Sequence, residues 1–354
     1  MELEKILQEA AARGASDVFL IAGLPLTYKI GGQQERLEQA GRLQPDDTRQ
    51  LAAALYRLAQ RTPACLAGGQ TDDDFSFALP GVARFRVNLF YQRGSLAAVV
   101  RVIRFGVPTA AQMHIPPEVM RLAQLKNGLA LVTGSAGSGK STTLGCIVNE
   151  INQTRVGHIL TLEDPVEFIH RHGQCIITQR EIPIDCPNYV TALRSALRES
   201  PDVILLGEMR DRETAEVAMQ AAETGQLLLT SLHTSGAANT IDRIIDAFPP
   251  QQQPQIRLQL SMVLRAVVSQ QLVPDVDGQP LPVFEILYTN LAVRNLIRES
   301  KTHQLDAAIA GAAAQGMRTM DMALYDLVRA GRITRQTALD HAVTPDALRR
   351  RLGA

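Results

Sequence analysis

The chain has 354 residues, of which 36 are basic and 36 are acidic, so its formal net charge is zero. This balance argues against binding of nucleic acid or of an anionic membrane surface through the net charge of the chain. The absence of Trp argues against a surface on which nucleic-acid bases stack. The sequence has no apolar run of 18 residues, and its start has no apolar signal core, so we expect neither a transmembrane helix nor a secretory leader. Its four cysteines have neither zinc-ribbon nor disulfide-scaffold spacing.

Residues 1–104 are predicted to form a small α+β domain. Apolar residues at helical spacing predict a first helix over residues 3–10. Asp46 and Asp47 are suited to cap a second helix that runs to about residue 60. Strands are predicted at 17–23, 26–32 and 75–105, the last segment with a turn near Arg93. Within that segment Phe85 and Val87 alternate with Arg86, so the arginine lies on the opposite face of its strand.

The texture of the sequence changes after residue 104. Residues 105–117 contain three prolines and little periodicity, and we interpret them as a linker. Residues 118–354 are predicted to form the second domain, because apolar strands alternate there with helices, as in a parallel α/β sheet. Its expected strands are 129–134, 158–164, 202–208 and 226–234, and its expected helices are 141–153, 189–200 and 212–225. The tail beyond about residue 255 is predicted to be mostly helical, with one strand at 281–288.

The strongest motif is Gly134–Ser141, which matches the P-loop pattern GxxxxGK[ST] between an expected strand and an expected helix. Glycines let backbone N–H groups curl around phosphates, and the helix N-terminus adds positive potential. Lys140 is expected to reach the β- and γ-phosphates, and the Ser141 hydroxyl to bind Mg²⁺. The predicted nucleotide-binding residues are Gly134, Ser135, Ala136, Gly137, Ser138, Gly139, Lys140, Ser141 and Thr142.

Two acidic residues and a histidine stand where expected strands end. These are Glu163, Glu208 and His233. Because ligands gather at the carboxyl ends of the strands in open α/β sheets, we expect both acids to face the nucleotide and His233 to sense the γ-phosphate. Taken singly, each acid is also explained as a capping or loop carboxylate, and the histidine as a structural residue. The P-loop in the same sheet favours the catalytic interpretation.

Four segments of the chain follow one another in the order GSAGSGKST, LEDPVEF, LLGEMRDRETAEVAMQAAETG and LLLTSLHTSGA. In this order and spacing they resemble the secretion ATPases of type II secretion and type IV pili. Within that group, VARFRVN at 82–88 and AVRNLIRE at 292–299 are similar to the PilT-type retraction ATPases of twitching motility. Phe19 stands where the family usually has His, which leaves the detailed contacts of the first domain open.

The resemblance implies an α/β fold with a RecA-like P-loop ATPase domain, preceded by a small PAS-like α+β domain, in a homo-hexameric ring. It implies ATP and Mg²⁺ as cofactors, Glu163 as catalytic base and Glu208 as the acid on the Mg²⁺ side in an atypical Walker B motif. His233 resembles the His-box residue. Arg86 and Arg101 resemble arginines that approach the γ-phosphate from the N-terminal domain, although a strand arginine is also explained as simply solvated.

The function that the resemblance implies is an ATP-hydrolysing motor for type IV pilus retraction. Such a motor is cytoplasmic, peripheral at the inner membrane, and pulls pilin through a platform protein of that membrane. The absent CxxC pair, the short N-terminus and AVRNLIRE argue against a pilus-assembly or type II secretion ATPase. The intact acids argue against a weakly hydrolysing accessory ATPase or scaffold that partners a paralogue. Zero net charge and the absence of Trp argue against a nucleic-acid translocase.

The AVRNLIRE segment is predicted to form a helix with Arg294 and Arg298 on one face. Leu296 and Ile297 would form an apolar edge beside these charges. Such a surface suits contact with another body, and packing on its own domain is the alternative.

Overall fold

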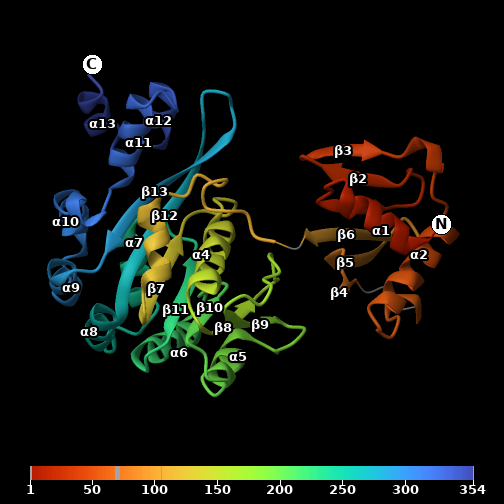
Figure 1. Cartoon of the computed structure of the whole chain (residues 1–354), viewed down its shortest axis with the longest axis horizontal. Coiled ribbons are helices and arrows are strands. Elements are labelled where there is room, and N and C mark those ends of the chain that lie inside the picture. Colours follow the sequence, from red (N-terminus) through yellow and green to blue (C-terminus); the bar gives the residue numbers. More distant parts are fainter. Residues whose placement is uncertain (1, 68–71, 105, 354) are drawn as a thin grey trace. The chain divides into compact units, whose positions relative to one another are not determined.

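A computed structural model gives the fold of the chain and describes residues 2–67, 72–104 and 106–353. The chain divides into two compact units. The first comprises Met1–Gly106 with Glu167–His170, and the second comprises Val107–Val166 with Arg171–Ala354. Each unit has its own sheet and its own hydrophobic core. Figure 1 labels most of their helices and strands.

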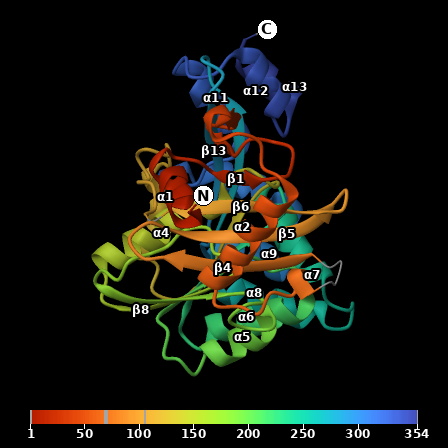
Figure 2. The same cartoon turned by 90° about the vertical axis from the view of Figure 1, so that its right-hand side faces the viewer.

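The first unit is built on an antiparallel sheet. Its strands are β1 Asp17–Leu20, β2 Thr27–Ile30, β3 Gln33–Arg36, β4 Asp73–Leu79, β5 Ala83–Gln92 and β6 Ser95–Arg104. They pair in the order β3-β2-β1-β6-β5-β4, and Figure 2 shows β1, β6, β5 and β4 side by side. The predicted turn near Arg93 is confirmed, because Arg93 and Gly94 both have positive φ, as a tight hairpin of this kind requires.

Two helices, α1 Leu3–Ala12 and α2 Pro45–Leu58, share one core with the sheet. The first helix is confirmed, and Leu3, Ile6, Leu7 and Ala10 are its buried residues. Asp47 caps the second helix, as predicted, but it does so from the third helical position. Gln44 is the N-cap residue, Pro45 is the first helical residue, and Asp47 accepts a hydrogen bond from the Gln44 amide at 2.8 Å. A proline is preferred at that first position because its missing N–H would have no partner there.

The second unit holds a seven-stranded sheet within the described residues. Its strands are β7 Gly128–Thr133, β8 Gly157–Glu163, β9 Cys175–Glu181, β10 Val203–Leu206, β11 Leu227–Leu232, β12 Leu264–Pro274 and β13 Pro280–Tyr288. They pair in the order β13-β12-β7-β11-β10-β8-β9, and each neighbouring pair is parallel except β12 with β13. The parallel sheet confirms the predicted α/β fold class.

Helices cover both faces of this sheet. They are α3 Pro117–Met120, α4 Lys140–Thr154, α5 Tyr189–Ala196, α6 Arg212–Glu223, α7 Ala237–Asp246, α8 Gln253–Val263, α9 Leu291–Arg298, α10 Leu305–Gly311, α11 Met320–Arg329, α12 Arg335–His341 and α13 Pro345–Arg351. Leu129 and Leu131 of β7 pack with α5–α10, whereas Ala130 and Val132 pack with α3 and α4. This alternation explains why the strands read as continuous apolar runs. None of the described helices is both long and apolar enough to cross a membrane.

Two predictions about the tail are wrong. The tail is not helical around residues 264–274, because β12 lies between β7 and β13 there and is mostly buried. The apolar edge expected on α9 does not face outward at Ile297, which is fully buried in the core, and Leu296 packs against the same core. Packing on its own unit therefore accounts for these two side chains, while Arg294 is exposed.

Candidate active site

The P-loop connects β7 to α4, the strand–loop–helix order that was predicted. Gly139 is the N-cap residue of α4, with φ of 87° and no side-chain cap, so the helix N-terminus is open to an anion. Two glycines are required by their surroundings. A Cβ at Gly134, where φ is 144°, would lie 2.1 Å from the Gln270 carbonyl oxygen, and one at Gly139 would lie 2.9 Å from Gln270 Nε2.

Gln270 of β12 holds the P-loop in place. Its Nε2 donates to the Ser138 carbonyl at 2.7 Å, and its Oε1 accepts from Thr143 Oγ1 at 2.7 Å. Gln270 and Ser138 are both buried, so these bonds are made away from water. Sequence reasoning missed this residue because it missed the strand that carries it.

Lys140 is buried and lies along the loop that precedes it. Its Nζ donates to the carbonyl oxygens of Gly134 and Ser135, at 3.0 and 2.8 Å. The same nitrogen is 3.5 Å from His233 Nδ1, at the end of β11. Because an ammonium group can only donate, Nδ1 is the acceptor, and the proton of a neutral His233 ring is then on Nε2.

Glu208 joins this group from the segment that follows β10. Its Oε2 is 3.4 Å from His233 Nε2, and its Oε1 forms an ion pair with Arg210. Glu208 is 9% exposed. The structure therefore brings Lys140, the first residue of α4, into one chain of contacts with His233 and Glu208, which follow β11 and β10. It adds Arg210, which was not predicted.

Glu163 ends β8, the strand next to β10. Its Oε1 accepts from Thr161 Oγ1 at 2.7 Å and from Gln179 Nε2 at 3.3 Å. Tyr189 is close to both acids: burial raises the pKa of its phenol, and the charges of Glu208 and Asp164, followed by that of Glu163, raise it further. The tyrosine is a second neighbour that sequence reasoning missed, because it comes from the start of α5.

Arg86 and Arg101 belong to the first unit, on β5 and β6. They are direct partners across the two strands, off the face that carries Phe85 and Val87, as was predicted. Like charges placed directly opposite each other on a sheet are destabilising. An ion pair partly offsets this repulsion at Arg101, because its Nε donates to Oδ1 of the buried Asp17 at 3.1 Å, and Asp17 is 5% exposed.

The donors near the P-loop fit a metal ion that arrives with a nucleotide. Ser141 and Glu208 offer a hydroxyl and a carboxylate, the hard oxygens that Mg²⁺ prefers, and Mg²⁺ usually takes its remaining ligands from phosphates and water. Among the residues described, no group of three or more His, Cys, Asp or Glu side chains could hold a metal by itself.

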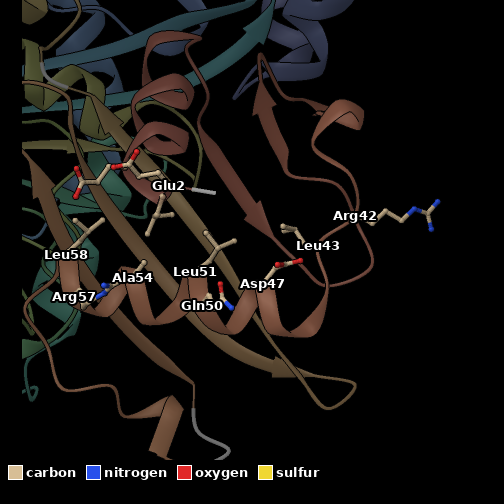
Figure 3. Close-up of a pocket in the computed structure, with 11 residues that line it drawn as sticks. Glu2, Arg42, Leu43, Asp47, Gln50, Leu51, Ala54, Arg57 and Leu58 are labelled. Atoms are coloured by element: carbon tan, nitrogen blue, oxygen red, sulfur yellow. The ribbon is translucent and has the colours of Figure 1, made fainter.

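Two cavities differ in their relation to these residues. One, of about 210 Å³, is lined by Glu208, Arg210, His233 and Arg243 among others. The other, of about 570 Å³, lies in the first unit between the start of α1 and α2, where Figure 3 shows Glu2, Asp47 and Arg57 around it. No predicted site residue lines this second cavity.

Comparison with known proteins gives consistent relatives. The family described as Type II/IV secretion system protein matches residues 1–319. The type IV pilus retractation ATPase PilT of Pseudomonas aeruginosa is 42% identical over 346 residues, which cover 98% of this chain and 99% of that protein. The type IV pilus ATPase PilU of the same organism is 38% identical over 350 residues, covering 99% of this chain and 91% of that protein.

A solved structure agrees with these relatives. The pilus retraction motor PilT with bound ADP is 43% identical, covers 99% of both chains and superposes with a TM-score of 0.88. A match of this length, together with a formed P-loop, settles the class of protein. The chain belongs to the Type II/IV secretion system protein family and is a nucleotide-binding ATPase.

Proposed function

We propose that this chain is the motor that powers retraction of a type IV pilus by hydrolysing ATP. The observation that carries the proposal is the likeness to PilT in both sequence and fold, which extends over nearly the whole length of both chains. The chain of contacts from Lys140 through His233 to Glu208 supports it, because it joins the P-loop to the two neighbouring strand ends.

The site residues have distinct roles in this proposal. Lys140 transfers its hydrogen bonds from two loop carbonyls to the β- and γ-phosphates, whose charged oxygens are stronger acceptors. Glu163 orients and deprotonates the attacking water. Ser141 and Glu208 would hold Mg²⁺, which would supply positive charge to neutralise the charge that develops on the phosphates. His233, between Lys140 and Glu208, responds to the γ-phosphate.

We also propose the assembly that turns hydrolysis into movement. Six copies form a ring at the cytoplasmic face of an inner membrane, where the ring acts on a pilus platform protein. The domains 1–104 and 118–354 move about the start of the predicted linker 105–117, because residues from Val107 onward belong to the second unit. Arg86 and Arg101 couple that movement to the γ-phosphate, since a guanidinium group keeps its charge and fits phosphate oxygens.

The proposal is tested with Lys140→Ala in a piliated bacterium that lacks its own copy of the gene. The variant should neither hydrolyse ATP nor restore retraction, because the β- and γ-phosphates of ATP lose the lysine that neutralises their charge. Lys126→Ala is the matched control, since Lys126 is an exposed lysine of the same unit, and it should restore both. Normal turnover in Lys140→Ala would overturn the P-loop assignment, and retraction without turnover would overturn the motor.

An accessory retraction ATPase is the second candidate, and the likeness to PilU over 99% of this chain favours it. The two candidates differ in what the chain can do alone. A main motor restores retraction to a strain that lacks PilT, whereas an accessory ATPase restores only a strain that lacks PilU.

A further inference from the structure

The loop between β11 and α7 carries His233, and two buried side chains hold its far end. Gly236 N–H donates to Ser269 Oγ at 2.9 Å, and Ala237 N–H donates to Glu285 Oε1 at 2.7 Å. Ser269 and Glu285 are 2% and 4% exposed and are direct partners across β12 and β13. Two neighbouring strands therefore bind two consecutive amides of this loop.

Glu285 also binds a second helix. Its other oxygen, Oε2, accepts from the Met320 N–H at 3.3 Å, at the start of α11. The N-cap residue of α7 is Gly236, which offers no side-chain cap, so Glu285 takes over that function from a distant strand. Burial raises the pKa of the Glu285 carboxyl, and the hydrogen bonds from the two helix N-termini oppose that shift by favouring the charged form.

Strand β12 also connects these contacts to the P-loop. Ser269 is paired in register with Thr133, the last residue of β7, and the next residue along β12 is Gln270, which binds the P-loop. Thr240 of α7 lies between Thr133 and Thr234, with hydroxyl distances of 3.4 and 2.8 Å. The loop that carries His233 is therefore fixed at several points to the strands that support the P-loop.

We infer that Glu285 is a positioning residue for ATP hydrolysis, which holds the His233 loop in register with the P-loop and ties it to α11. The inference rests on the proposed role of His233. Glu285 touches no reacting atom and acts through the Gly236–Ala237 end of the loop. Movement of the C-terminal helices would reach the ATPase site through this carboxylate.

The test is a double-mutant cycle on the purified full-length chain, with Glu285→Gln and His233→Ala. Glutamine keeps the shape of the side chain but turns one of its two acceptors into a donor that faces an N–H group. Glu285→Gln should lower kcat about tenfold, the scale seen when the support of a catalytic group is lost, and leave ADP affinity within about twofold. In the His233→Ala background the same change should add less than about twofold.

Asp275→Asn is the matched control. Asp275 also accepts hydrogen bonds from two backbone amides, those of Asp277 and Gln279, at 2.9 and 2.8 Å, in the turn between β12 and β13. It should keep kcat unchanged. If Glu285→Gln fails to fold, Ser269→Ala removes only the acceptor of Gly236 and should show the same dependence on His233.

Three results would overturn the inference: unchanged kcat in Glu285→Gln, a full tenfold loss in the His233→Ala background, or an equal loss in Asp275→Asn. Full turnover in His233→Ala alone would remove the role of His233 and this inference with it. That result would leave the ATPase motor standing, since the motor is tested by Lys140→Ala.

Discussion

Gly134 of the P-loop offers a test of how tightly β12 supports the nucleotide site. A methyl group at Gly134 would lie 2.1 Å from the Gln270 carbonyl oxygen and 2.7 Å from Ser138 Oγ. The serine oxygen can rotate away, but the carbonyl belongs to a buried central strand and can move only with that strand. Gly137 is the matched position in the same loop, because its φ is also positive, at 77°, and nothing lies within 4 Å of its added Cβ.

The magnitude follows from the difference between these two sites. Gly137→Ala carries only the strain of a left-handed residue, about 1–2 kcal/mol. Gly134→Ala carries backbone strain of about 1–3 kcal/mol and, in addition, overpacking of about 1–3 kcal/mol. The gain from a stiffer unfolded chain is the same in both variants and cancels in the comparison. Backbone strain is of similar size in the two variants, so overpacking sets the difference, and we expect Gly134→Ala to be less stable than Gly137→Ala by about 1–3 kcal/mol.

Urea unfolding of the nucleotide-free chain measures this difference, followed by the fluorescence of a probe in the second unit. Omitting nucleotide matters, because a ligand that binds only the folded state would add its own contribution to stability. Equal unfolding free energies for the two variants would refute the close approach of β12 to the P-loop, and with it the support that we assign to Gln270.

Three further predictions concern chemistry, thiol reactivity and the α9 surface. Glu163→Gln should bind ATP normally but lose about 10²-fold or more of its turnover, the scale of a lost general base. Glu208→Gln should instead shift the Mg²⁺ dependence of turnover. Identical behaviour of both variants across a Mg²⁺ titration would contradict these separate roles. Burial raises the pKa of Cys146 to about 11, so at pH 8 its alkylation, followed by peptide mass spectrometry, should be about 100-fold slower than that of an ordinary thiol until the chain is unfolded. Arg294→Ala should reduce pilus retraction and keep ATPase activity, because Arg294 is exposed; equal loss of both would indicate a packing role.

The parts of the site that the sequence predicted are those specified locally. The P-loop is one continuous segment whose glycines and lysine act on backbone and phosphate within a few residues. Glu163, Glu208 and His233 could be found because each directly follows an apolar run, and parallel strands bring such positions to one edge of the sheet. No long-range information was needed for these residues.

Besides Arg210 and Tyr189, the parts of the site that the sequence did not predict depend on β12. Its polar residues Ser269 and Gln270 interrupt the apolar pattern, and the strand follows α8 without a loop, so the segment reads as the continuation of a helix. Only its place between β7 and β13 makes it a strand, which is tertiary context overriding a local signal. Glu285 was missed for a related reason, since nothing near it in sequence shows that its carboxylate meets two helix N-termini.

Arg101 joins a proposed catalytic role to a structural one, and a test must separate them. Without Arg101, the buried Asp17 keeps the hydrogen bond from Ser16 Oγ to one oxygen, at 2.9 Å, but loses the arginine at the other oxygen. This loss should lower the free energy of unfolding by about 1–3 kcal/mol. Asp17→Asn breaks the same ion pair and keeps the arginine, so it is the control. Both variants should be less stable, but only Arg101→Ala should cut turnover, with a smaller loss of ATP affinity.

Rings assembled from two different variants then show which subunit's nucleotide Arg101 serves. If Arg101 acts across a subunit boundary, rings that combine Arg101→Ala with Lys140→Ala subunits should regain some activity, at interfaces where the two wild-type halves meet. No recovery in demonstrably mixed hexamers would mean that Arg101 serves the nucleotide of its own subunit. Equal turnover in Arg101→Ala and Asp17→Asn would reduce the arginine to its ion pair, and its position opposite Arg86 would then need another explanation.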